Sequence, residues 1–458
     1  MNWKPVFLIA LLFLVSISSV TLKVQSVEAS GTVYIRADGS IDPPTAPIST
    51  MDNVTYVLTG NITNEVDGIV IERNNVVLDG EGYVLEGIGR GIELSGRSNV
   101  TIQNINIKNF LFGFYLIYSS NNSISGNAIT NNNNGIELDS SSNNNISGNN
   151  VTDNSWNGIL VGNSSNNNVS GNTITNNSYS GISLSNSTNN SVIGNQITAN
   201  SDYGIGLQFS SSYNSIIGNN ITANNRYGIW FEYSSDYNNV SGNNITDNVT
   251  GIWLYGSSNN RIDENNITDN PGVAIEFREF SNNNSISGNN ITNSNYGIAL
   301  DSSTNNTITG NSMKNNSHSI GVGYSSDFNS ISGNTLANNS YGIWLGYSSD
   351  NSVYRNNFIN NTVHVDGNTT EYPNSWDDGR EGNYWSNYNG TDANHDGIGD
   401  TPYVIDANNT DHYPLMISYI IPEFPSFFVL PLFMIAALLA FTAFRRKRAK
   451  LSRATSVS

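Results

Sequence analysis

The sequence predicts an all-β fold, a parallel β-solenoid of about 13 coils, and three observations indicate it. A motif such as SGNNIT, found from Ser241 and again from Ser287, recurs in related forms every 22 to 24 residues. Each unit holds short runs of alternating apolar and polar residues, which is typical of strands rather than helices. Asparagine, glycine and serine, which suit tight turns, separate these runs. A fixed short period of this kind indicates a stack of similar coils.

The N-terminal segment has the composition of a secretory signal peptide. Residues 1–29 contain Lys4, an apolar run and the residues VEA before Ser30. A charged start, an apolar centre and a small-residue end are typical of a cleavable signal. We therefore expect an exported protein, in which residues 30–54 form an N-terminal cap or strand before the coils begin.

Residues 55–370 hold the repeats, and asparagine occupies fixed positions in them. Equal positions on successive coils lie about 4.8 Å apart, so side-chain amides in one column can hydrogen-bond to one another. One column follows the glycine position of the motif in eleven copies, nine of which have glycine there, and a shorter column lies about five residues further on. We expect both columns to be scaffold. They comprise Asn127, Asn149, Asn172, Asn195, Asn219, Asn243, Asn265, Asn289, Asn311, Asn334 and Asn356, and then Asn154, Asn177, Asn200, Asn224, Asn248 and Asn270.

The GIxLx run of each unit should place two columns of side chains on the outer surface, because residues alternate in direction along a strand. Trp230 and Trp253 then lie on adjacent coils, near Glu276. The first column reads Val70, Glu93, Tyr115, Glu137, Leu160, Ser183, Gly206, Trp230, Trp253, Glu276, Ala299, Gly321, Trp344 and His364. The second column reads, over the middle coils, Gln208, Glu232, Tyr255, Arg278 and Asp301.

Exposed aromatic rings beside carboxylates and an arginine are suited to sugars, since a ring face contacts the apolar side of a sugar and charged groups bind its hydroxyls. The sequence thus predicts a glycan-binding face made of Trp230, Trp253, Tyr255, Glu232 and Arg278. The alternative is that large aromatic residues are here because they favour strands and stabilise them by cross-strand packing.

A catalytic role for the same face stays open. Glu232 and Glu276 are two coils apart, roughly 9–10 Å at the backbone, which approaches the carboxylate spacing of inverting glycosidases. Arg278 offers a positive charge for a uronate in a lyase or an epimerase. Glu232, Glu276 and Arg278 are therefore the catalytic candidates, against the alternative of solvated surface charges.

Residues 371–420 differ in composition and are rich in Trp, Tyr, Asp and Gly. Within them, DANHDGIGD spaces oxygen ligands as the first part of an EF-hand loop does, although Tyr403 stands where that loop has glutamate. We expect this segment to cap the solenoid and to bind a structural Ca²⁺, rather than to form a plain Asp/Gly turn. The expected ligands are Asp392, Asn394, Asp396, the Ile398 carbonyl and Asp400.

The C-terminus predicts a membrane anchor. Residues 425–444 are apolar and long enough to span a bilayer, and residues 445–458 are basic, which favours a cytoplasmic tail. Residues 30–422 hold 11 basic and 35 acidic residues, a balance of −24. Such a surface disfavours nucleic acids as partners.

The SGNxIT and GIxL units, followed by SWDDGREGNYWSNYNGTDANHDGIGDTPY and YPLM, resemble the NosD-like proteins over roughly residues 55–416. The resemblance implies a single-stranded, right-handed parallel β-helix of the pectin-lyase-like type, which is found in many archaeal surface proteins. The motif PEFPS before the apolar span resembles archaeal surface-sorting signals. The fold alone does not imply a function.

The copper handling known for this family is disfavoured by the residues present. Copper(I) prefers Cys, Met and His ligands. The segment between the signal and the anchor has no Cys, and its Met and His residues form no close motif; they are Met51, Met313, Met416, His318, His364, His395 and His412. We therefore expect an exported, membrane-anchored surface protein that is structural or glycan-interacting, with no copper. A polysaccharide-active enzyme on the same scaffold is the alternative.

Overall fold

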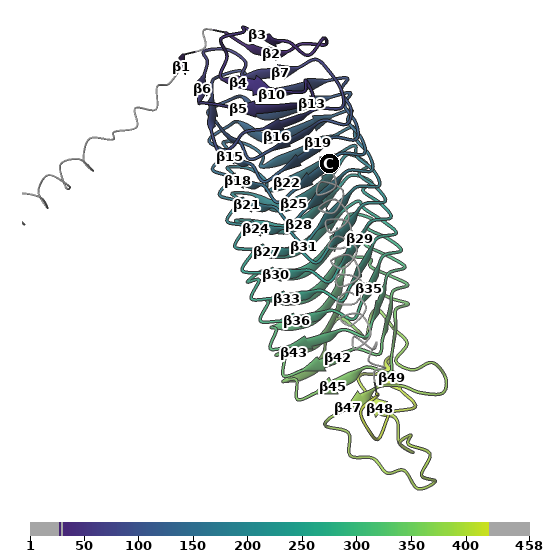
Figure 1. Cartoon of the computed structure of the whole chain (residues 1–458). Helices are drawn as coiled ribbons and strands as arrows, with labels where there is room; N and C mark the ends of the chain where they lie inside the picture. The colour runs from purple at the N-terminus through teal and green to yellow at the C-terminus, as the bar shows by residue number, and fades with distance from the viewer. Residues whose placement is uncertain (1–26, 29–30, 421–458) are drawn as a thin grey trace, which may run out of the picture. The chain divides into compact units, whose positions relative to one another are not determined.

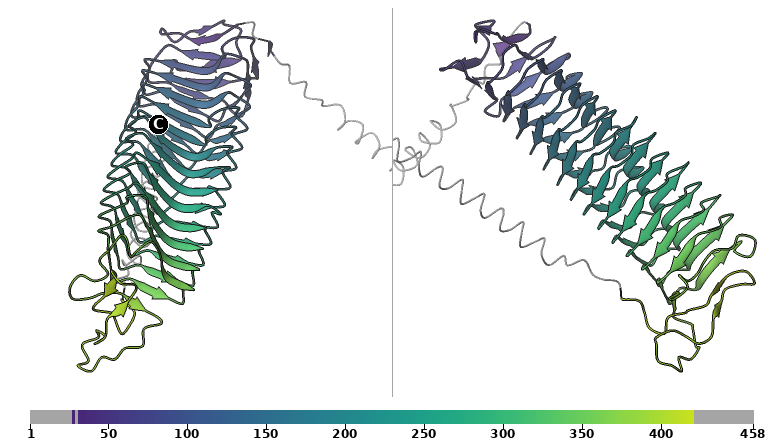
Figure 2. Two further views of the ribbon diagram at one scale, coloured as in Figure 1. Left: turned by 180° about the vertical axis from the view of Figure 1, so that it is seen from behind. Right: turned by 90° about the vertical axis from the view of Figure 1, so that its right-hand side faces the viewer.

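The computed structural model describes residues 27–28 and 31–420. They form a parallel β-solenoid of about 14 coils, drawn in Figure 1 as a column of arrows that begins at the N-terminal strands. Two sheets of 16 strands and one of 15 run along the column, and Figure 2 shows them from two other sides. The all-β solenoid predicted from the repeat is confirmed, with about one coil more than the sequence period predicts.

Each coil contributes one strand to each long sheet, in the order sheet B, sheet C, sheet A. The strands of sheet A, in spatial order, are β1 (Val27–Glu28), β6 (Ile62–Thr63), β9 (Val84–Glu86), β12 (Asn106–Lys108), β15 (Ala128–Thr130), β18 (Asn150–Thr152), β21 (Thr173–Thr175), β24 (Gln196–Thr198), β27 (Asn220–Thr222), β30 (Asn244–Thr246), β33 (Asn266–Thr268), β36 (Asn290–Thr292), β39 (Ser312–Lys314), β42 (Thr335–Ala337), β45 (Asn357–Ile359) and β47 (Tyr384–Trp385).

The strands of sheet B are β3 (Ile41–Asp42), β2 (Val33–Ile35), β7 (Ile69–Ile71), β10 (Arg90–Ser95), β13 (Phe112–Ile117), β16 (Asn134–Asp139), β19 (Ile159–Gly162), β22 (Ile182–Ser185), β25 (Tyr203–Gln208), β28 (Tyr227–Glu232), β31 (Thr250–Tyr255), β34 (Val273–Arg278), β37 (Tyr296–Asp301), β40 (His318–Gly323), β43 (Tyr341–Gly346) and β46 (Val363–Gly367). Most of them are longer than the strands of the other two sheets, so sheet B offers the broadest outer face.

The strands of sheet C are β4 (Ile48–Thr50), β5 (Thr55–Leu58), β8 (Val77–Asp79), β11 (Thr101–Gln103), β14 (Ser123–Ser125), β17 (Asn145–Ser147), β20 (Asn168–Ser170), β23 (Ser191–Ile193), β26 (Ser215–Ile217), β29 (Asn239–Ser241), β32 (Arg261–Asp263), β35 (Ser285–Ser287), β38 (Thr307–Thr309), β41 (Ser330–Ser332) and β44 (Ser352–Tyr354). A separate hairpin joins β48 (Tyr403–Val404) to β49 (Thr410–Asp411).

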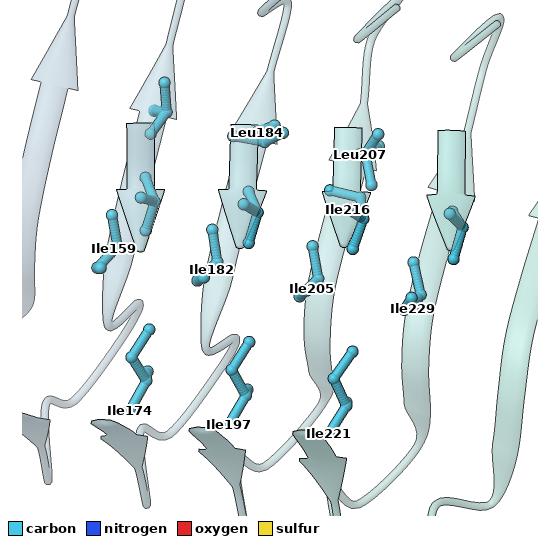
Figure 3. Close-up of a cluster of buried hydrophobic side chains, with 14 of the residues drawn as sticks. Ile159, Ile174, Ile182, Leu184, Ile197, Ile205, Leu207, Ile216, Ile221 and Ile229 are labelled. Atoms are coloured by element: carbon cyan, nitrogen blue, oxygen red, sulfur yellow. The ribbon is translucent and has the colours of Figure 1, made fainter. Parts of the chain in front are cut away.

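The core consists of columns of identical side chains. In β19, β22, β25 and β28 the isoleucines Ile159, Ile182, Ile205 and Ile229 stack in register, and each is fully buried. Figure 3 shows this column beside those of the neighbouring sheets. Burial of a side chain of this size stabilises the fold by about 1.5–3 kcal/mol. Because every coil adds the same contacts, the alternating pattern of the sequence translates directly into a continuous core.

The asparagine columns form hydrogen-bonded ladders, as predicted. Asn219 donates its side-chain amide to Asn243 Oδ1 over 3.0 Å, and Asn243 donates to Asn265 Oδ1 over 2.9 Å. The residue before each ladder asparagine has a left-handed backbone, for example Gly242 with φ of 62°, which glycine adopts without strain. A third ladder, which the sequence pattern did not reveal, lies at the turn from sheet B to sheet C and includes Asn238 and Asn260.

Segments outside the repeat extend the solenoid at both ends. At the N-terminal end β3 pairs antiparallel with β2, and β4 with β5, so residues of the predicted cap segment add strands to sheets B and C. At the C-terminal end Trp385 stacks between Phe358 and Tyr403, with ring centroids 4.2 and 4.3 Å apart. These rings lie over the last coil and separate the core from solvent.

Most of the predicted targeting segments lie outside the described residues. This holds for the signal peptide (1–29) apart from Val27–Glu28, which forms β1 and pairs with β6. It also holds for the predicted anchor (425–444), the sorting-type motif and the basic tail (445–458). Among the residues that the structure describes, no helix is long and apolar enough to cross a bilayer.

Candidate functional site

The register of sheet B brings the predicted site residues together on its outer face. Trp230 of β28 pairs with Trp253 of β31, which in turn pairs with Glu276 of β34. On the neighbouring outward column, Glu232 pairs with Tyr255. The alternation in the GIxLx run is therefore confirmed for these strands, with the intervening Ile, Leu and Phe side chains buried.

The two tryptophans belong to a larger aromatic cluster. The ring centroids of Trp230 and Trp253 are 6.1 Å apart, and both rings lie near Tyr227, at 6.3 and 5.1 Å respectively. Trp253 also lies 5.4 Å from Tyr255, whose ring is inclined to it by 27°. All four rings are partly exposed, so the cluster is packed internally and still presents apolar surface to solvent.

A cavity of about 300 Å³ opens beside this cluster. Trp230, Glu232 and Trp253 line it together with residues at the start of each strand. The additional lining residues are Asp202, Tyr203, Arg226 and Tyr227, which sequence reasoning missed. The sequence does contain a pattern that could have identified Tyr203 and Tyr227. Tyrosine precedes the GI motif in four coils, at Tyr203, Tyr227, Tyr296 and Tyr341.

Tyr203 forms the floor at one side of the cavity. Its ring lies flat over Gly206, where an added Cβ would be 2.4 Å from the ring, so only glycine fits at that position. The ring is 4.8 Å from Trp230 and fully buried, and burial raises the pKa of the phenol. Gln208 donates a hydrogen bond to its hydroxyl group. This ring is thus a rigid support for the indole of Trp230.

The carboxylates of the cavity are partly desolvated. Burial raises the pKa of Glu232. Burial also raises the pKa of Asp202, and Arg226, with a nitrogen 3.9 Å from the Asp202 carboxylate, opposes that rise. The indole N–H of Trp230 is buried and has no hydrogen-bond acceptor within the described part of the chain. The cavity therefore combines ring surface, two carboxylates and one guanidinium.

Glu276 and Arg278 lie at the edge of the cluster and bind each other. The Arg278 Nε donates to Glu276 Oε1 over 2.5 Å, and neither residue lines the cavity. Glu276 is 9% exposed, whereas Arg278 is exposed. The structure thus places the predicted carboxylate pair in unequal surroundings: Glu232 faces the cavity, and Glu276 is held in an ion pair.

The outward column ends differently from the sequence prediction. Trp344 pairs with Asp366 of β46, so the expected continuation to His364 is wrong. His364 is buried instead, near Phe358 and Trp385. The last coil lacks the GI motif that fixes the register in the others, and the prediction was therefore displaced by two residues.

The predicted Ca²⁺ loop is a compact turn in the C-terminal cap. Its carboxylates accept hydrogen bonds from the loop backbone: Asp392 from Gly397 N over 3.0 Å, and Asp396 from Ile398 N over 2.9 Å. Asp400 accepts from Ala393 N over 2.8 Å. Within residues 31–420, no three His, Cys, Asp or Glu side chains converge closely enough to hold a metal ion.

The Met and His residues considered for copper lie in different environments. Met313 is fully buried in the core. His318 lies on the outer face, stacked between Tyr296 and Tyr341 with centroids 4.4 and 4.6 Å apart, and burial lowers its pKa. The structure does not bring this pair together as a binding motif.

Comparison with known families gives two matches. Residues 48–224 match the family described as periplasmic copper-binding protein (NosD), and residues 206–363 match the family described as right handed beta helix region. No curated protein gives a significant sequence match.

Several solved structures resemble the fold. The A-module of the Azotobacter vinelandii mannuronan C-5 epimerase AlgE4 is 16% identical, with a TM-score of 0.49, and the match covers 66% of this chain and 91% of that one. The Dettilon tailspike protein is 17% identical, with a TM-score of 0.44, over 69% of this chain and 68% of that one. The tailspike protein of the E. coli bacteriophage HK620 is 12% identical, with a TM-score of 0.46, over 76% and 71%.

These likenesses concern the architecture only. The right-handed β-helix is the fold described by the family that residues 206–363 match, and the three-sheet coils of the structure agree with it. The chain is a parallel β-helix whose residues 48–224 match the NosD family and whose residues 206–363 match the right handed beta helix region family.

Proposed function

We propose that the protein is an exported surface protein that binds a neutral polysaccharide on the outer face of sheet B. The observation that carries this proposal is the cavity of about 300 Å³ lined by Trp230, Trp253, Tyr227 and Glu232. Partly exposed rings offer apolar surface for a sugar, and the adjoining charged groups offer acceptors and donors for its hydroxyls. Retention at the membrane by residues 425–444 is part of the proposal.

The charges favour an uncharged ligand. The cavity contains Asp202 and Glu232 but only Arg226 as a cation, and the segment between signal and tail is strongly acidic. This surface would repel a polyuronate, because negative charges at close range raise the free energy of the complex. A neutral hexose or pentose polymer avoids that repulsion.

Trp253→Ala should abolish this binding. We expect the purified full-length chain to bind at least one polymer among a β-glucan, a mannan and a xylan, and we expect the variant to bind it more than about tenfold more weakly, because the ring is central to the cluster. Affinity electrophoresis with each polymer measures the effect.

Trp344→Ala is the matched control, since this tryptophan occupies the same strand position four coils away and its ring lies over Gly323 and Gly346. Both variants lose ring packing, so their melting temperatures should fall alike, whereas only Trp253→Ala should lose the polymer. Equal retention by both variants would contradict a site at Trp253, and failure of the wild type to bind any neutral polymer would contradict the function.

Hydrolysis of the bound polymer is the second candidate function. The raised pKa values of Glu232 and Asp202, which both line the cavity, favour it, because a general acid must stay protonated near neutral pH. The same incubations, assayed for new reducing ends, distinguish an enzyme from a binding protein: release of products identifies a hydrolase.

The Ca²⁺ role of the cap loop is a further part of the proposal. It rests on the type and spacing of Asp392, Asn394, Asp396 and Asp400, with the Ile398 carbonyl, as oxygen ligands for a hard cation. Asp392 and Asn394 both accept from the Asp396 backbone N–H at 3.2 Å, so these two side chains already gather at one side of the loop.

Ca²⁺ should therefore raise the melting temperature of the chain relative to chelator. Saturation at a hundred times the dissociation constant adds about 2.7 kcal/mol to the stability of the folded state. Asp396→Ala should remove this response. Asp378→Ala, which loses a cap carboxylate bound to Arg355, should lower stability and keep the response. The site would be disproved by a wild-type melting temperature that is insensitive to Ca²⁺.

A further inference from the structure

The turn from sheet B to sheet C carries exposed rings on two of the three coils that line the cavity, those of β25 and β28. After β25 its sequence is FSSSYN, and after β28 it is YSSDYN. We name the four rings of these turns the corner patch: Phe209, Tyr213, Tyr233 and Tyr237. Their exposed fractions lie between 51% and 57%, so about half of each side chain faces solvent.

These rings occupy backbone positions that do not suit them. Their φ angles are 51°, 60°, 47° and 58°, a left-handed conformation that bulky side chains rarely adopt. In the two preceding coils the same turn positions hold asparagine, which tolerates this conformation. These residues are Asn163, Asn166, Asn186 and Asn189, with φ between 48° and 57°.

The turn itself does not require the rings, since asparagine fills the same positions in the two preceding coils. The rings pair with each other, Tyr213 with Tyr237 at 5.1 Å and Phe209 with Tyr233 at 6.4 Å, but the pairs remain half exposed. Bulky residues held in a strained conformation while exposing apolar surface indicate an interaction site.

The corner patch is continuous with the cavity cluster. The edge of Tyr233 contacts the ring of Tyr255 at 5.8 Å, and Tyr255 lies 5.4 Å from Trp253. Serine and aspartate side chains lie between the rings of the patch; the Ser212 hydroxyl, for example, accepts from Asp236 N over 3.0 Å. Ring contacts therefore connect the face of sheet B to Tyr233 at the corner, and polar side chains separate this ring from the pair Tyr213 and Tyr237.

We propose that the corner patch is a second contact for the same neutral polysaccharide. The bound chain then leaves the face of sheet B across the corner, transverse to the solenoid axis. This inference rests on the proposed function, and it adds the direction of the ligand and a minimum ligand length. Oligosaccharides long enough to reach the corner should bind more tightly than those that fill only the cavity.

The double variant Tyr233→Asn/Tyr237→Asn of the full-length chain tests this directly. The probes are cello-, manno- and xylo-oligosaccharides of disaccharide and octasaccharide length, titrated by calorimetry. For the series that the wild type binds, we expect the octasaccharide to bind the variant about tenfold more weakly and the disaccharide to bind unchanged. The melting temperature should stay constant or rise, because asparagine suits the backbone of this turn.

Tyr118→Asn is the control, since Tyr118 lies exposed at the same turn position with φ of 50°, five coils nearer the N-terminus. It should alter neither affinity. If Trp253→Ala abolishes binding while the double variant binds both lengths as the wild type does, the corner proposal is wrong and the proposed function stands. An equal loss of affinity for the disaccharide and the octasaccharide also overturns the corner proposal. Absence of any binding by the wild type overturns both.

Discussion

Asn243→Leu should destabilise the solenoid by about 3–5 kcal/mol, although the two side chains are similar in size. Asn243 Oδ1 accepts from both the backbone and the side-chain N–H groups of Asn219, at 2.9 and 3.0 Å. Its own amide donates to Asn265 and to the backbone carbonyl of Ile216, both at 2.9 Å. Leucine would remove these hydrogen bonds and leave the buried backbone N–H of Asn219 without its acceptor, and an unsatisfied buried group costs about 1–3 kcal/mol.

Asn244→Leu is the matched control in the next position. Asn244 also belongs to a row of amides, in which it donates to Asn220 over 2.8 Å, but this row lies on the outer face of sheet A, where water can replace the lost partner. We expect a loss below about 1 kcal/mol. Urea denaturation compares the two variants, and hydrogen exchange locates the loss to the coils beside the substitution. Equal stability of the two variants would show that the ladder is not a stabilising element.

Trp385→Ala should destabilise the C-terminal cap by a comparable free energy, about 3–5 kcal/mol, which is typical for truncation of a buried tryptophan. The ring is 1% exposed and lies between Phe358 and Tyr403. Its N–H donates to Asp411 Oδ2 over 2.8 Å. Burial raises the pKa of Asp411 to about 6, so removal of this donor leaves a carboxylate that is already poorly solvated.

The effect should be local to the end of the solenoid. Limited proteolysis should release fragments cut after residue 370 from the variant and leave the earlier coils intact, because coils contact only their neighbours. Tyr384→Ala, on the same short strand but partly exposed, should resist cleavage nearly as well as the wild type. Proteolysis that destroys all coils of Trp385→Ala at one rate would contradict a separate cap.

The sequence predicted the scaffold well because one period repeats in it many times. The positions of Ile229 and Ile252 in the core and of Trp230 and Trp253 outside follow from alternation, which each coil repeats with the same phase. Where the repeat weakens, the prediction failed, as at His364, where no GI motif fixes the strand. Ladder amides such as Asn238 were missed because runs of several asparagines do not show which one points inward.

The candidate site was predicted only in part, for a different reason. Trp230, Trp253 and Glu232 could be placed by their strand positions, but Asp202, Arg226 and Tyr227 lie at strand starts, where the turn geometry decides which side chains converge. The strain at Tyr233 and Tyr237 lies in their left-handed φ angles. The sequence does not reveal these angles, because some coils have asparagine and others tyrosine at the same turn position. The pairing of Glu276 with Arg278 likewise required side-chain positions.

The most direct test of the glycan-binding face is a crystal structure of the full-length protein with the longest neutral oligosaccharide that it retains. We expect sugar rings within about 4 Å of Trp230 and Trp253, with hydroxyls bonded to Glu232 or Asp202. The oligosaccharide should continue toward Tyr233 at the corner. An oligosaccharide bound to sheet A or sheet C, with the cavity beside Trp253 filled only by water, would show that sheet B does not carry the binding face.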